Sequence, residues 1–105
     1  DPQADGAFAV TPDPRHFVHS LEHGRVEIEY SPDLPEDDQL AIKGVFDEDP
    51  GGMLLFPNAD MPYEVAATAW TNMLGCKRYE GAATLDALRA FRDTFRGQGP
   101  EPVPL

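Results

Sequence analysis

The clearest alternation of polar and apolar residues along the chain runs from residue 25 to residue 30. Its apolar members are Val26, Ile28 and Tyr30, and its polar members are Arg25, Glu27 and Glu29. A period of two places successive side chains on opposite faces of a strand. The segment is therefore predicted to be a half-buried strand whose charged face is open to water.

Three stretches have the composition and the boundary residues of helices. The first, residues 16–23, is short and stops before Gly24, a residue type common just after a helix. The second, near residues 36–47, has acids in its first turn, where the helix dipole favours them. The third is expected to be capped by Thr84 and to end at Gly97. Its apolar positions recur at helical spacing and are Leu85, Leu88, Phe91 and Phe95.

Apolar runs between the second and third helices predict three further strands. Residues 53–56 are continuously apolar and bounded by turn residues, as in a buried strand. Residues 63–70 and 73–79 are predicted to pair as a hairpin through a turn at residues 71–72. Because alanine is a weak strand former, a helix over residues 64–75 is the alternative.

Together these elements predict an α/β fold with a small mixed four-stranded sheet, two main helices and a short helix before the first strand. The order strand, helix, strand, strand, strand, helix (βαβββα) is thioredoxin-like, and Pro62 stands where such folds place a cis-proline before the hairpin. A shared topology carries no activity. The chain has no C-x-x-C pair, so disulfide exchange is not supported.

The length of 105 residues predicts a single domain. Many of the eleven prolines stand near the two ends of the chain. We therefore expect an extended lead-in over residues 1–15, one globular domain over residues 16–98 and a proline-rich tail over residues 99–105.

Acidic residues outnumber basic ones by 19 to 8, which gives a formal net charge of −11. Such a surface repels phosphates, so nucleic acid is excluded as a partner and anionic lipid is disfavoured. A cation or a basic partner fits better, although acids also keep a small domain soluble. The one basic feature is a row of arginines on the last helix: Arg89, Arg92 and Arg96. This row is interpreted as a solvated face or as the contact for a protein partner or a second copy.

Two of the three histidines, His19 and His23, stand four residues apart in the first predicted helix. This spacing places both imidazoles on one helix face, about one turn apart. Imidazole suits copper, zinc and nickel, so the pair predicts a transition-metal site. The residues expected to complete it are Glu22, in the same turn, and the soft ligands Met73 and Cys76. Completion by cysteine and methionine favours copper over zinc, whereas an oxygen-rich set favours zinc.

Two other hypotheses compete with the metal site. In the first, the histidines are structural and the chain is an acidic protein-interaction domain. In the second, Cys76 is a nucleophile activated by His19 or His23. A lone cysteine is more often a small buried residue, and no helix N-terminus or glycine-rich elbow surrounds this one. P-loop, Rossmann and G-x-S-x-G patterns are absent, so a binding domain without an organic cofactor is favoured over an enzyme.

Four blocks carry a family resemblance: Val-His-Ser-Leu-Glu-His-Gly at 18–24, Tyr-Ser-Pro-Asp-Leu-Pro at 30–35, Thr-Ala-Trp at 68–70, and Phe-Arg-Gly-Gln-Gly-Pro-Glu at 95–101. Together they resemble a bacterial domain-of-unknown-function family, number 3105, over roughly residues 16–101. The first block is the most specific of the four.

The resemblance implies a small globular domain outside the cytoplasm, secreted or anchored by an upstream membrane segment. His19, Glu22 and His23 match the central motif of the family. Family members often carry a further histidine upstream in a Ser-Gly-x-His context, and residues 1–15 contain none. The sequence itself has no apolar run of membrane-spanning length, so no direct membrane insertion is expected.

Overall fold

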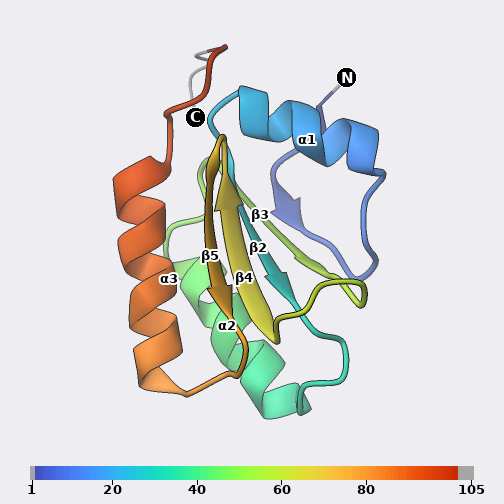
Figure 1. Ribbon diagram of the computed structural model, residues 1–105, viewed down its shortest axis with the longest axis vertical. Coiled ribbons are helices and arrows are strands. Elements are labelled where there is room, and N and C mark those ends of the chain that lie inside the picture. Colours follow the sequence, from blue (N-terminus) through green and yellow to red (C-terminus); the bar gives the residue numbers. More distant parts are fainter. Residues whose placement is uncertain (1, 102–105) are drawn as a thin grey trace.

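The computed structural model describes residues 2–101, which form one five-stranded mixed sheet and three helices (Figure 1). In chain order the elements are β1 (Gly6–Ala7), α1 (Pro14–Glu22), β2 (Val26–Tyr30), α2 (Glu36–Glu48), β3 (Met53–Pro57), β4 (Val65–Ala69), β5 (Asn72–Cys76) and α3 (Ala82–Phe95). The strands lie in the order β1-β3-β2-β4-β5. The first three strands are mutually parallel, whereas β4 runs antiparallel to β2, and β5 antiparallel to β4. The prediction of a mixed α/β fold is confirmed.

The prediction of four strands is wrong, because the sheet has a fifth strand, β1. Gly6 and Ala7 pair in parallel with Leu54 and Leu55 of β3. The Phe8 amide extends this pairing by donating to the Leu55 carbonyl at 2.8 Å. Two residues are too few to show a period of two, so the sequence predicts only an extended segment there.

The helices begin close to where the sequence places them. α1 begins at Pro14, two residues early, because the Asp13 carboxylate accepts a hydrogen bond from the Arg15 amide and proline suits the first turn. Thr84 lies inside the first turn of α3 and does not cap it; its hydroxyl accepts from the Glu80 amide at 2.8 Å. No helix among residues 2–101 is long and apolar enough to cross a membrane.

The hairpin β4–β5 shows that the alternative helix over residues 64–75 is wrong. Ala69 pairs with Asn72 across a two-residue turn, in which Thr71 has a φ of 65°. Tight two-residue hairpins favour such positive φ values because their twist matches that of the strands. None of the described peptide bonds is cis, including the one before Pro62.

One face of the sheet holds the hydrophobic core, covered by α2 and α3 (Figure 1). Val26 and Ile28 of the central strand are fully buried there. Ile42 and Val45 of α2 and Leu88 of α3 pack on the same cluster. The apolar half of the alternation in β2 therefore faces the core, as the sequence predicts.

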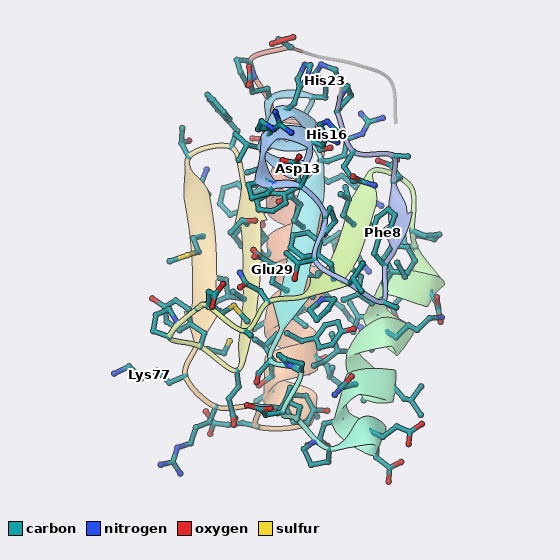
Figure 2. All side chains as sticks on the ribbon, turned by 90° about the vertical axis from the view of Figure 1, so that its right-hand side faces the viewer. Phe8, Asp13, His16, His23, Glu29 and Lys77 are labelled. Atoms are coloured by element: carbon teal, nitrogen blue, oxygen red, sulfur yellow. The ribbon has the colours of Figure 1, made fainter. Side chains whose placement is uncertain are left out.

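The expectation that the charged face of β2 is open to water is wrong. Glu27 is only 1% exposed to solvent and Glu29 only 8%. Figure 2 shows Glu29 in the middle of this face. Phe17 of α1 stacks on Phe56 of β3 with ring centroids 5.1 Å apart, so α1 packs against the same face. The pattern identifies which residues share a face, but it does not reveal that a short helix folds back over that face.

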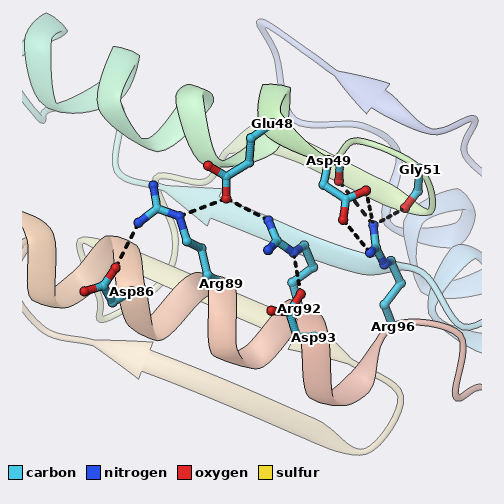
Figure 3. A network of polar contacts seen from close by, with 8 residues as sticks. All are labelled: Glu48, Asp49, Gly51, Asp86, Arg89, Arg92, Asp93 and Arg96. Atoms are coloured by element: carbon cyan, nitrogen blue, oxygen red, sulfur yellow. Dashed lines mark hydrogen bonds and ion pairs between the residues drawn. The ribbon is translucent and has the colours of Figure 1, made fainter.

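The arginine row of α3 is paired within the chain and is not a simply solvated face (Figure 3). Arg89 and Arg92 both donate to Oε1 of Glu48 at the end of α2, at 2.8 and 2.9 Å. Arg96 donates to both carboxylate oxygens of Asp49, at 2.9 and 2.7 Å. A partner that used these arginines would have to displace carboxylates that join α2 to α3.

Candidate metal centre

The C-terminal end of α1 brings His19 and His23 together. Their ring centroids lie 4.5 Å apart, with the rings at 69° to each other. His23 is the residue at which the helix ends, and its amide donates to the carbonyls of His19 and Ser20 at 3.3 and 3.1 Å. The spacing of four residues thus places the two imidazoles side by side. Figure 2 labels His23 near the top of its view.

Gly24 turns the chain from α1 into β2. Its φ of 82° lies in the left-handed region, which glycine adopts without a steric penalty. Its carbonyl accepts a hydrogen bond of 2.7 Å from the amide of Gly97. The segment that follows α3 therefore reaches the corner between α1 and β2.

The third member of the site is Glu101, in the segment after α3. Its amide donates to the Glu22 carbonyl at 2.9 Å, and its Oε1 lies 3.4 Å from Nε2 of His23. Among residues 2–101, the candidate ligand atoms of His19, His23 and Glu101 lie within 4.8 Å of one another. Glu101 stands 78 positions after His23 (101 − 23), so no local pattern indicates it. Its one signal in the sequence is its place in the recognisable block at residues 95–101.

The geometry of this cluster suits two kinds of chemistry. A protonated His23 would form an ion pair with Glu101, at a distance somewhat longer than a usual hydrogen bond. A neutral His23 would instead offer a metal ligand beside a carboxylate ligand. Bonds of about 2.0–2.1 Å in a tetrahedral zinc site separate two ligands by about 3.3 Å, close to the 3.4 Å found here.

The cluster is partly open to solvent. The His23 side chain is 19% exposed and the Glu101 side chain 51% exposed. A cavity of about 460 Å³, a size within the range of small-ligand sites, lies between residues 2–5 and the end of α1 and has His23 in its wall. Water and small ions therefore have a route to the His23 imidazole.

The structure does not bring Cys76 to the histidines. Cys76 pairs with Val65, and Val65 pairs with Tyr30, at the end of β2 remote from Gly24. Burial, with the nearby charge of Glu80, raises the pKa of the Cys76 thiol. A nucleophilic cysteine needs the opposite shift, so both the thiolate ligand and the Cys–His enzyme lose their basis.

Met73 and the Glu22 carboxylate also lie outside the cluster. Met73 pairs with Thr68 on the edge strand β5, two strands away from β2, and is 58% exposed. Glu22 contributes its backbone carbonyl, which holds the Glu101 amide, but its carboxylate is not among the clustered atoms. The residues that come together are thus two imidazoles and the carboxylate of Glu101.

A separate pair of titratable side chains lies on the buried acidic face of β2. Burial, reinforced by the charge of Glu29, raises the pKa of Glu27 to about 9. Among the described residues its Oε2 has no hydrogen-bond partner. Burial also raises the pKa of Glu29, although that carboxylate accepts from the Asn58 amide at 2.9 Å and the Thr68 hydroxyl at 3.3 Å. These carboxyls are enclosed, so we assign them to the energetics of the fold and not to the metal centre.

Comparisons with known proteins bear on the family and not on the chemistry. No curated protein and no solved structure matches the chain. The family model described as "Protein of unknown function (DUF3105)" matches residues 2–104. This match confirms the resemblance carried by the four sequence blocks. The chain belongs to the DUF3105 family of proteins of unknown function.

Proposed function

We propose that this protein is a non-enzymatic domain that binds one divalent transition-metal ion through His19, His23 and Glu101. The observation that carries the proposal is the convergence of three candidate ligand atoms, within 4.8 Å, from two segments at opposite ends of the chain. Two imidazoles and one carboxylate form a common zinc ligand set, which leaves a coordination position open.

Zinc is the favoured ion, in place of the copper expected from the sequence. The case for copper depends on soft sulfur ligands, and Met73 and Cys76 lie on β5, away from the histidines. An oxygen ligand from Glu101 moves the preference of the set towards zinc. Copper(II) remains the natural competitor because its affinity for nitrogen and oxygen sites generally exceeds that of zinc.

The exposure of the cluster favours an exchangeable ion over a permanently enclosed one. A structural zinc site is closed by four protein ligands, whereas this cluster has three, and Glu101 is half exposed. We therefore propose a role in taking up or handing over a metal ion. An extracytoplasmic location is part of the proposal and rests on the family resemblance alone.

We also propose that the fold is thioredoxin-like. The strand order β1-β3-β2-β4-β5, with a parallel half and an antiparallel half, supports this assignment. The assignment adds nothing to the function because fold and activity are separable.

The test is metal retention by protein without an affinity tag. We expect the wild-type protein to retain about one equivalent of zinc after equilibrium dialysis, and a His19→Ala/His23→Ala variant to retain none. His16→Ala is the matched control, since His16 lies on the same helix and outside the cluster. Zinc at about 100 times its Kd should stabilise the wild type by roughly 2.7 kcal/mol and leave the double variant unchanged.

The proposal would be overturned if the wild-type protein retained no zinc and its Tm did not change on addition of zinc. The contact of His23 with Glu101 would then be a structural ion pair, and the acidic interaction domain would be the better hypothesis. That outcome has its own signature: replacing His23 would lower the Tm by the same amount with and without added metal.

A further inference from the structure

The segment from Gly97 to Glu101, called here the C-terminal strap, is fastened to the corner of α1 and β2 by its backbone. The Gly97 amide donates to the Gly24 carbonyl at 2.7 Å, and the Glu101 amide donates to the Glu22 carbonyl at 2.9 Å. Figure 1 shows the chain after α3 rising past the end of α1. The strap thus crosses the chain at Glu22 and Gly24, just before β2 begins.

Two glycines allow this close approach. A Cβ at Gly99 would lie 2.3 Å from the Glu22 carbonyl oxygen and 2.4 Å from the Gly24 amide nitrogen. A Cβ at Gly24 would lie 2.9 Å from the carbonyl carbon of Gly97. All of these neighbours are backbone atoms, which cannot swing aside as a side chain can. A side chain at Gly99 therefore forces the strap away from the corner.

The position of the Glu101 carboxylate depends on the strap. Its side chain is half exposed, and its one polar side-chain contact among the described residues is with His23. A half-exposed glutamate side chain keeps several rotamers, so holding it over the histidines costs conformational entropy. The two backbone hydrogen bonds of the strap supply the restraint.

We propose that Gly99 is a positioning residue for the metal centre: it lets the strap dock on the α1–β2 corner and so sets the Glu101 ligand beside His23. The inference deepens the proposed function and rests on it. With the strap docked, the site offers two nitrogens and one oxygen. With the strap displaced, two imidazoles one helical turn apart remain, and zinc loses its oxygen ligand.

The experiment compares zinc affinity in a double-mutant cycle of Gly99→Ala and Glu101→Gln. We expect each single variant to weaken zinc binding about 10–100-fold, the range seen when ligand-orienting partners are removed. The double variant should be no weaker than the worse single variant, because both act through one carboxylate. Gly44→Ala is the matched control, since a Cβ there meets no atom within 4 Å.

Each result separates the two proposals. A wild-type protein that binds no zinc overturns the proposed function itself. A wild-type protein that binds zinc, with a Gly99→Ala variant that binds it equally well, overturns the positioning role alone. The positioning role is also contradicted if the fold-losses of zinc affinity in the two single variants multiply in the double variant. Gly99 and Glu101 would then act independently.

A second measurement decides the matter where Gly99→Ala fails to fold. Hydrogen exchange of the Gly97 and Glu101 amides in the wild-type protein should slow on addition of zinc, since a ligand that binds the docked strap must stabilise it by linkage. The Ile28 amide in the central strand reports the stabilisation of the whole fold by zinc, and the exchange of the strap amides is compared with it. Zinc binding that leaves exchange of the strap amides unchanged overturns the inference.

Discussion

Both faces of the sheet are buried, but one of them buries two carboxyl groups among its apolar side chains. The face under α2 and α3 is lined by aliphatic residues such as Val26 and Ile28. The other face, against which α1 packs, holds Glu27 and Glu29 beside the buried apolar side chains of Leu54 and Phe56. Residues 27 and 28 are neighbours in one strand, so they share a backbone conformation and differ in side chain and in the face of the sheet that they occupy.

The difference distinguishes buried side chains that stabilise the folded state from buried side chains that cost free energy. Burial of Ile28 removes apolar surface from water and stabilises the fold. Burial of Glu27 removes an ionisable group from water without a partner for Oε2, so the carboxyl takes up a proton instead. The face under α2 and α3 therefore stabilises the fold through apolar burial, and the carboxyl groups of the other face make the stability dependent on pH.

The largest expected effect comes from the apolar face. Ile28→Ala should destabilise the protein by about 2–5 kcal/mol, because it removes buried methyl groups and leaves a cavity in the core. Urea unfolding at pH 7 measures the change. Met73→Ala on the exposed edge strand is the control and should have little effect. Equal losses in the two variants would contradict the assignment of the core to this face.

The second effect comes from the acidic face and has the opposite sign. A pKa of Glu27 raised to about 9, from 4.5, means that the folded state keeps a proton that the unfolded state releases. Stability then falls as the pH rises from about 4.5 towards 9, and Glu27→Gln, which never ionises, should be more stable by about 1–3 kcal/mol at pH 8. Urea unfolding at pH 4.5 and pH 8 measures it. A variant with the same pH dependence as the wild type would show that Glu27 is solvated.

The smallest effect belongs to the exposed carboxylates of the α2–α3 contact. Hydrogen bonds from Arg89 and then Arg92 hold the pKa of Glu48 below its ordinary value. The ionised Glu48 therefore stabilises the fold fully above its unfolded-state pKa, and this stabilisation is lost as the pH falls through its folded-state pKa. Glu48→Gln should lower the Tm slightly at pH 7 and low salt, and the difference should vanish in high salt or at pH 3. A Tm difference insensitive to salt would argue that Glu48 contributes packing and not charge.

The sequence predicts the parts of this molecule that depend on local spacing. The alternation at Val26 and Ile28 identifies the core face of β2, and the four-residue spacing of His19 and His23 predicts adjacent imidazoles. Both inferences need only the geometry of one strand or one helix.

Features that depend on contacts between distant segments cannot be predicted from local spacing in the sequence. β1 is too short to have a pattern, and α1, which packs on the face of the sheet that holds Glu27, precedes β2 in the chain. Glu101 reaches His23 through the strap, and Cys76 is removed from the histidines by the direction in which β5 runs. Composition alone makes Cys76 the better ligand, but strand register decides against it.

The docking of the strap also bears on the order of events in folding. α1 is held on one side by the N-terminal segment, where the Gln3 amide donates to the His16 carbonyl, and on the other by Glu101. The second contact closes a loop of 79 positions (101 − 22), and such closures cost more entropy than those within the sheet. We therefore expect the histidine corner to assemble late, on a sheet already formed. A metal ion bound there would report on the completed fold, since the site does not exist until both ends of the chain have met.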